Sequence, residues 1–374
     1  MRLLFTAVSA HGHVLPMAPL MRSALEAGHQ VALVASSGLS DLVHKDLPVG
    51  VEFLPAGPMP LELATEAANR TGGDVMKPTI EGIGETFGGV LLDQSIDDAL
   101  PAAREWKPDL IIADMYNPLG SYLSAALDVS WYRFRMSTEL PEAWRNAINR
   151  SAVERFRTAG LTPTPPTRTI SIWPSSLDTE THDTHNVLAM QATAHRRAST
   201  PSAAVHEVAA GGSVLVTFGT IFSDPELLDR VAVAIAEDHP NRTVVVTEGL
   251  HLGEKPAGGT AAESRIRTVP FTPLADLLQD TAAVVSVGGA GTVLGTLSAG
   301  VPLVLWPQGA DQLTIAAAAG RTGAAVVVSD PDDMVAAIRT VLDDPEYRRR
   351  AAEIRDEVRA LPTPAEVVMT LESQ

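Results

Sequence analysis

The sequence contains no cysteine among its 374 residues. This absence excludes disulfide bonds, thiolate nucleophiles and cysteine metal sites, and it is typical of proteins from a reducing compartment. Basic residues are also few, since 28 lysines and arginines face 45 aspartates and glutamates, and the formal charge is −17. Because an acidic surface repels nucleic acid and anionic lipid, we expect neither as a partner.

Long apolar runs are missing as well. No segment reaches the roughly 18 consecutive apolar residues that a membrane span needs. The N-terminus carries one arginine and a short apolar run before His11 and His13, which is typical of a core strand and not of a secretory signal. The sequence therefore predicts a soluble, cytoplasmic protein without a membrane span.

Short β-branched segments alternate with helical patterns along the chain, which is typical of parallel sheets built from strand–helix–strand units. Each half begins with a strand that runs into a glycine-containing loop, first at Phe5 to Gly12 and again at Val214 to Gly219. The pattern predicts an α/β protein with two doubly wound, Rossmann-like domains. The expected strands are 2–8, 30–35, 51–54, 109–113, 169–173, 213–218, 243–247, 266–269, 283–287, 303–306 and 324–328.

The sequence loosens between the two halves. Residues 162–167 are rich in proline, and residues 178–212 are polar with little periodicity. We therefore expect an N-terminal domain over 1–200, with its linker from about 178, and a C-terminal domain over 201–374. The last segment predicts helices broken at Pro362, of which the final one can pack back onto the first domain.

A glycine turn follows the apolar strand that ends near residue 287. Such a turn opens a helix and presents backbone N–H groups to an anion, most naturally a phosphate. A glycine-rich loop alone is a weak signal, but the strand before it and the apolar helix pattern after it supply the expected context. The predicted nucleotide or diphosphate residues here are Ser286, Val287, Gly288, Gly289, Ala290, Gly291 and Thr292.

Two polar residues, Asp311 and Gln312, follow the next strand. A carboxylate and an amide at this place can bind sugar hydroxyls and reject analogues that lack them. The alternative is that Asp311 caps the alanine-rich helix that follows. Both roles can hold together.

His13 lies in the loop at the carboxyl end of the first strand, where open α/β sheets bind ligands. Imidazole titrates near neutral pH and can act as a general base. The alternative is that His13 only caps the following helix. His11 and His13 lack a third ligand at metal spacing, so we expect no metal site.

Six motifs together resemble the GT-B nucleotide-sugar glycosyltransferases of family 1, especially bacterial enzymes that glycosylate natural products with dTDP-sugars. Each motif is weak alone, but their order and spacing match over nearly the whole chain. The motifs are Gly12–Pro16, Val216–Thr220, Val269–Leu278, Gly288–Thr292, Ala299–Pro302 and Pro307–Gln312.

The resemblance implies two domains facing across a cleft and an inverting, metal-independent transfer that uses a dTDP- or UDP-sugar as co-substrate and no other cofactor. His13 would be the base, and Asp114 would accept its second N–H. Asp311 and Gln312 would bind the donor sugar. Further nucleotide contacts would come from Gly219, Thr220 and Phe271.

The chain departs from the family where a histidine usually stands just before the glycines, because it has Val287, preceded by Ser286. Losing a charge-assisted hydrogen bond of roughly 1.5–3 kcal/mol would weaken donor binding or rate. Other donors such as Ser286 or Thr292 can compensate. Otherwise the chain is a weak or silent homologue that acts as a partner subunit, and a nucleotide-sugar epimerase on the same fold is a further alternative.

The acceptor is expected to be a hydrophobic small molecule bound by loops of the first domain. Apolar residues near such loops also pack simply as core, and the sequence does not separate the two roles. A homodimer is compatible with the sequence. The candidate acceptor residues are Met59, Met76, Phe87, Tyr116, Met136 and Trp144.

Overall fold

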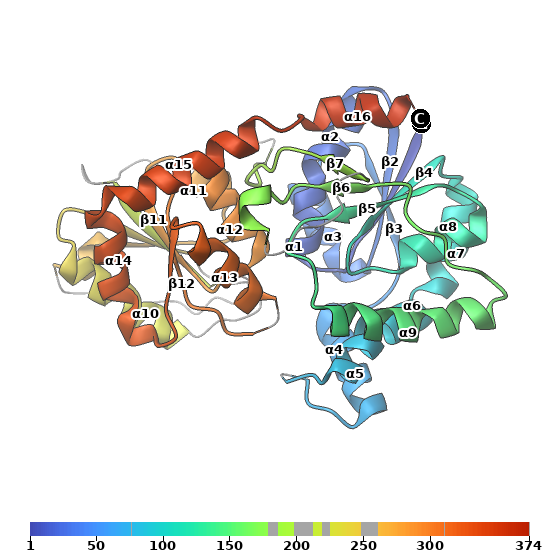
Figure 1. Ribbon diagram of the computed structural model, residues 1–374, viewed down its shortest axis with the longest axis horizontal. Helices are drawn as coiled ribbons and strands as arrows, with labels where there is room; N and C mark the ends of the chain where they lie inside the picture. Colours follow the sequence, from blue (N-terminus) through green and yellow to red (C-terminus); the bar gives the residue numbers. More distant parts are fainter. Residues whose placement is uncertain are drawn as a thin grey trace. The chain divides into compact units, whose positions relative to one another are not determined.

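The computed structural model describes residues 1–75, 77–178, 186–197, 212–218, 225–247, 261–309 and 311–373. The chain forms two compact units (Figure 1). Unit 1 comprises Met1–Ile172, His182–Met190 and Pro362–Gln374. Unit 2 comprises Trp173–Thr181 and Gln191–Leu361.

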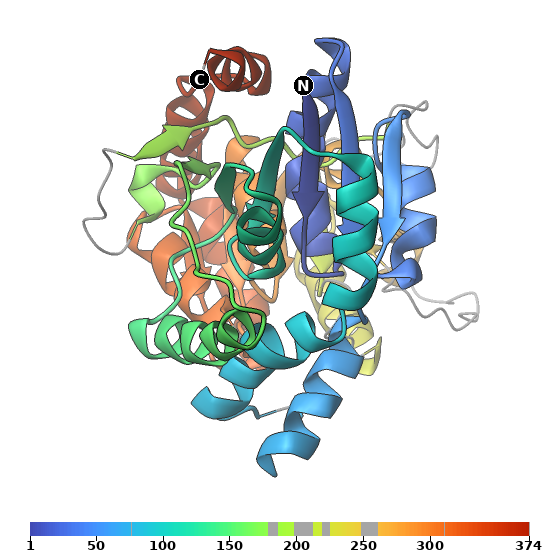
Figure 2. The ribbon, with the colours of Figure 1, turned by 90° about the vertical axis from the view of Figure 1, so that its right-hand side faces the viewer.

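Unit 1 is built on a parallel sheet whose seven described strands run in the order β3-β2-β1-β4-β5-β6-β7. Figure 2 follows this order from light-blue β3 at one edge, past dark-blue β1, to the green strands at the other. The order reverses between β1 and β4, which is where doubly wound sheets bind ligands. The strands are β1 (Arg2–Thr6), β2 (Gln30–Ala35), β3 (Val51–Pro55), β4 (Leu110–Asp114), β5 (Trp131–Arg135), β6 (Thr169–Ser171) and β7 (Val187–Ala189).

Unit 2 repeats this plan with six described strands, again all parallel, in the order β10-β9-β8-β11-β12-β13. Its order reverses between β8 and β11. The strands are β8 (Ser213–Thr217), β9 (Thr243–Thr247), β10 (Ile266–Val269), β11 (Thr281–Ser286), β12 (Leu303–Leu305) and β13 (Ala325–Val327).

Helices connect the strands of each sheet. Those of unit 1 are α1 (His11–Val14), α2 (Ala18–Glu26), α3 (Ser40–Asp46), α4 (Pro60–Thr71), α5 (Ile80–Gly84), the π-helix η3 (Glu85–Val90), α6 (Leu91–Asp93), α7 (Ile96–Trp106), α8 (Leu119–Leu127), α9 (Glu142–Thr158) and α16 (Pro364–Glu372). Those of unit 2 are α10 (Pro225–Asp238), α11 (Leu274–Leu277), α12 (Ala290–Ser298), α13 (Gln312–Arg321), α14 (Met334–Asp343) and α15 (Pro345–Arg359). No helix of the described chain is long and apolar enough to cross a membrane.

The predicted fold class is confirmed, and the reason lies in the strand sequences. Central strands such as β4 and β11 are buried along their whole length, because helices cover both faces of a parallel sheet. Each expected strand has a counterpart whose ends lie within two residues of the expected ones. Two short strands, β5 and β7, were missed.

The C-terminal helix α16 belongs to unit 1. It packs on α2 (Figure 1) and buries Val367, Val368 and Leu371. A capping box between Thr363 and Glu366 fixes the start of the helix, and Pro364 is its first residue. The second unit's continuous segment begins at Gln191, ten residues before the boundary expected from the sequence.

Candidate active site

His13 and Asp114 meet at the carboxyl edge of the unit 1 sheet. His13 lies in α1, directly after β1, and Asp114 is the last residue of β4. Because β1 and β4 are neighbours in the sheet, their carboxyl ends lie side by side. The imidazole Nδ1 is 2.6 Å from Asp114 Oδ2, although 101 residues separate the two in sequence.

Backbone donors hold the Asp114 carboxylate in place. The side chain is fully buried, and its Oδ2 also accepts a hydrogen bond from the Val8 N–H at 3.0 Å. Its Oδ1 accepts one from the Tyr116 N–H at 2.8 Å. Since a carboxylate only accepts, His13 Nδ1 carries the ring proton and Nε2 is left as an acceptor. The His13 side chain is 24% exposed, so the imidazole is not sealed off from solvent.

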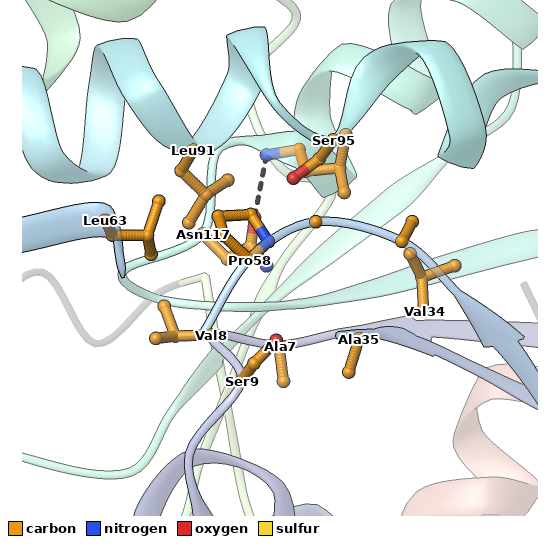
Figure 3. Close-up of a pocket in the computed structure, with 13 residues that line it drawn as sticks. Ala7, Val8, Ser9, Val34, Ala35, Pro58, Leu63, Leu91, Ser95 and Asn117 are labelled. Atoms are coloured by element: carbon orange, nitrogen blue, oxygen red, sulfur yellow. Dashed lines mark hydrogen bonds between the residues drawn. The ribbon is translucent and has the colours of Figure 1, made fainter. Parts of the chain in front are cut away.

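A small cavity lies at the same edge of unit 1 (Figure 3). The ends of β1 and β2 contribute Ser9 and Ala35 to its lining, and Asn117 lies across from them. Its volume of about 10 Å³ is the room of one water molecule. This cavity is therefore too small to hold an acceptor.

The structure brings three of the candidate acceptor residues to one apolar cluster. Tyr116 is a buried member of it, and Phe87 and Trp144 pack against it. Met136 is buried at 3% exposure. Met59 covers Gly38, where an added Cβ would lie 2.7 Å from the Met59 sulfur. Met76 lies outside the described residues.

The glycine turn of unit 2 has the form expected for an anion site. Gly288 adopts φ +89°, a conformation that favours glycine, and Gly289 precedes the first residue of α12. A Cβ added at Gly289 or at Gly291 would meet nothing within 4 Å, so the backbone here borders open space. The first-turn N–H groups of α12 have no intrahelical acceptor, an arrangement that favours a bound anion. Ala290, Gly291 and Thr292 supply them.

The side chain of Val287 points away from this turn and into the apolar core of unit 2. Its side chain is 3% exposed and belongs to the apolar core that also contains Val216 and Val285. Val285 lies in β11 and Val287 directly follows its last residue, and both side chains enter the same apolar core. Ser286 Oγ instead accepts a hydrogen bond from the Gly288 N–H at 3.2 Å and so shapes the turn.

Asp311 and Gln312 stand at the start of α13. Asp311 occupies the N-cap position, yet its side chain makes no capping hydrogen bond to the helix. Gln312 is 7% exposed, and its Oε1 accepts a hydrogen bond from the Gln308 N–H at 2.9 Å. One end of the Gln312 amide is thus used to hold the loop before α13.

The remaining nucleotide candidates differ in what the structure shows of them. Phe271 is partly buried, and the Arg197 guanidinium lies 5.9 Å from its ring centroid. Gly219 and Thr220 lie outside the described residues. Among the residues that the structure describes, no three His, Asp or Glu side chains form a group that could hold a metal ion.

The backbone donors of Val8 and Tyr116 were missed by sequence reasoning. Any residue other than proline offers an N–H, so the residue type carries no signal for them. The strand ends do carry a signal for these donors. Val8 lies two residues after the end of β1, Tyr116 lies two residues after the end of β4, and β1 and β4 are neighbours. That signal required the strand order to be known.

Two doubly wound units, with an imidazole–carboxylate pair in one and a glycine turn at a helix N-terminus in the other, are typical of transferases with a GT-B fold. Solved structures agree. The glycosyltransferase SsfS6 of Streptomyces sp. SF2575, determined in complex with thymidine diphosphate, matches with a TM-score of 0.85 and 27% identity over 100% of both chains. The spinosyn rhamnosyltransferase SpnG matches with a TM-score of 0.82 at 23% identity, a likeness in fold.

Sequence relatives narrow the class. A family model described as erythromycin biosynthesis protein CIII-like, C-terminal domain, matches residues 250–373. Elloramycin glycosyltransferase ElmGT of Streptomyces olivaceus is 26% identical over 99% of this chain and 97% of its own. The L-demethylnoviosyl transferase of Streptomyces niveus is 28% identical over 100% and 98%. The chain is thus a glycosyltransferase, and over its whole length it is similar to enzymes of antibiotic biosynthesis that transfer sugars.

Proposed function

We propose that this enzyme moves a sugar or deoxysugar from a dTDP- or UDP-sugar to a hydroxyl of a small apolar aglycone, with inversion and without a metal. The observation that carries the proposal is the 2.6 Å contact between His13 Nδ1 and Asp114 Oδ2. A hydroxyl that attacks the anomeric carbon in one displacement must lose its proton, and a positioned imidazole takes it.

The proton and charge follow from that contact. His13 Nε2 removes the hydroxyl proton while the acceptor oxygen forms the new bond to the anomeric carbon. The bond from that carbon to the diphosphate breaks, and the diphosphate leaves with the electron pair. Asp114, held by two backbone donors, stabilises the imidazolium that results.

The donor side of the proposal rests on α12. Its helix N-terminus favours negative charge, and the open space over Gly289 and Gly291 leaves room for a diphosphate. Asp311 and the amide nitrogen of Gln312 are proposed to bind sugar hydroxyls. The thymidine diphosphate complex of SsfS6 and the names of the relatives support a dTDP-sugar donor and a natural-product acceptor.

The argument for a silent partner subunit depended on Val287. Since that side chain belongs to the core of unit 2, its identity says little about phosphate binding. The assembled pair in unit 1 supports a working enzyme. An epimerase would change the sugar without an acceptor, so incubation with the nucleotide sugar alone distinguishes it.

The test measures transfer from dTDP-glucose and UDP-glucose to a panel of polycyclic and macrolide aglycones, with product configuration read by NMR. We expect His13→Ala to lower turnover by about 10²–10⁴-fold. His11→Ala, two residues away in the same helix, is the matched control and should keep its turnover. Near wild-type transfer by His13→Ala, or loss of wild-type turnover on chelation of metals, would contradict the proposal.

A further inference from the structure

Tyr116 touches both members of the pair in unit 1. It follows Asp114 by two residues, and its backbone N–H donates to Asp114 Oδ1. Its ring lies edge-on to the His13 ring, with centroids 5.3 Å apart and an angle of 77° between the planes. The residue is 7% exposed, so its ring offers little surface to a bound acceptor.

The imidazole is held by its bond to Cβ and by the hydrogen bond from Nδ1 to Asp114. Small rotations about Cα–Cβ and Cβ–Cγ can still tilt the ring, and the tilt moves Nε2 sideways. An aromatic ring packed edge-to-face against the imidazole limits this motion, because the arrangement has a preferred geometry. Tyr116 occupies that place.

Tyr116 is itself supported from the other side. The Phe87 ring lies 6.0 Å from it, and Phe87 belongs to the π-helix η3, an uncommon element that recurs at functional sites. A Cβ at Gly88 would lie 2.2 Å from the Ile148 carbonyl oxygen of α9, so only glycine permits this close packing. The support behind Tyr116 is therefore rigid.

Charged side chains fasten the same segment. Arg70 and Arg155 each pair with both Glu85 and Asp93, at distances between 2.6 and 3.0 Å. These pairs link α4, η3, α6 and α9. The charged group holds the segment that carries Phe87, the Phe87 ring lies beside Tyr116, and the Tyr116 ring packs against the imidazole of His13.

We propose that Tyr116 is a positioning residue for His13, which deepens and rests on the function proposed above. The Tyr116 ring holds the imidazole in one orientation. Nδ1 then stays hydrogen-bonded to Asp114 and keeps its proton, and Nε2 stays directed toward the acceptor hydroxyl. Loss of the ring should lower kcat and leave the acceptor KM unchanged. An acceptor-binding role for Tyr116 would instead raise KM.

The experiment compares Tyr116→Leu, which removes the ring, with Tyr116→Phe, which keeps it. Tyr122→Leu is the matched control, because Tyr122 is a buried tyrosine of the same apolar cluster whose ring packs on Phe156 instead. Histidine ¹⁵N shifts report the His13 tautomer without any substrate, and the pH profile of transfer reports its titration.

We expect Tyr116→Leu to lower kcat about tenfold, to shift the pH profile and to add the Nε2–H tautomer. Tyr116→Phe and Tyr122→Leu should keep the wild-type tautomer and profile. If Tyr116→Leu matches Tyr122→Leu in both readouts, the inference is wrong. If Tyr116→Leu does not fold, Phe87→Leu must produce the same change in smaller measure, and its failure to do so also overturns the inference.

The two proposals fail in distinguishable ways. Full activity of His13→Ala would reject His13 as the base, while the tautomer measurement would still decide whether Tyr116 positions the ring. An inactive His13→Ala together with an unchanged Tyr116→Leu would reject the positioning role alone.

Discussion

The candidate sites of the two units are built from different parts of the chain. In unit 1, two side chains from distant segments meet, and backbone donors hold one of them. In unit 2, consecutive residues of one turn present backbone N–H groups beside open space. A side-chain site depends on the identity and orientation of each residue, whereas a backbone site depends on chain conformation and on the absence of bulk.

The largest expected effect tests the side-chain site. Asp114→Asn replaces one of two accepting oxygens with an amide nitrogen that donates, so the side chain can no longer accept from Val8 N–H, Tyr116 N–H and His13 Nδ1–H together. We expect kcat to fall by up to about 10⁴-fold, because the ring would adopt the other tautomer. Transfer assays measure this, and circular dichroism checks the fold. A loss below tenfold in a folded variant would show that unit 1 does not depend on this pair.

The next prediction concerns Val287, whose side chain is buried in the core of unit 2 beside the glycine turn. Val287→His buries an imidazole in an apolar core and should lower the free energy of unfolding by about 2 kcal/mol. Urea titration measures it. The same change at Val49, which is 97% exposed, should leave stability unchanged. Tighter dTDP binding by Val287→His with no loss of stability would mean that residue 287 faces the diphosphate after all.

A third variant fills the open space of the backbone site. Gly291→Val should weaken dTDP binding about tenfold, since the new side chain takes the room left for the diphosphate. Stability should not fall, because valine suits a helix at least as well as glycine does. Calorimetric titration gives the Kd, and Gly291→Ala should weaken it less. Unchanged binding in both variants would place the diphosphate elsewhere.

The smallest effect concerns the charged support of unit 1. Hydrogen bonds from Arg155, then from Arg70, hold the pKa of Asp93 below its usual 3.8. A lowered folded-state pKa adds stability above the unfolded value, and this is lost as pH falls through the folded value. Asp93→Asn should therefore cost about 1 kcal/mol at pH 7 and less at pH 3.

Urea unfolding at the two pH values checks this prediction. Asp41→Asn removes an exposed carboxylate paired with Lys45 and is the control for charge alone. A cost for Asp93→Asn that stays equal at both pH values would show that the ion pairs are not its source.

The site of unit 2 was easier to predict than the site of unit 1, because its residues are consecutive in the sequence. The turn of unit 2 is local, so the strand, the glycines and the helix pattern of residues 284–297 suffice to indicate it. The pairing of His13 with Asp114 needs β1 and β4 to be neighbours, although β2 and β3 come between them in the chain. Family resemblance supplied that pairing, which residue spacing alone could not.

The errors also have physical causes. Strand β5 was missed because Arg133 and Arg135 interrupt its apolar pattern, and β7 because it lies in the polar segment 178–212. The direction of the Val287 side chain, into the apolar core of unit 2, did not follow from its position beside the glycines.

The placement of α16 has a consequence for biosynthesis. The helix packs on α2, with Glu372 Oε1 2.8 Å from His29 Nε2, and it follows the whole of unit 2 in the sequence. The nascent N-terminal half must therefore wait, with the α2 surface uncovered, until translation of the other half is complete. Ribosome stalling or premature termination near residue 360 would release a chain whose first sheet is formed and whose outer layer is unfinished.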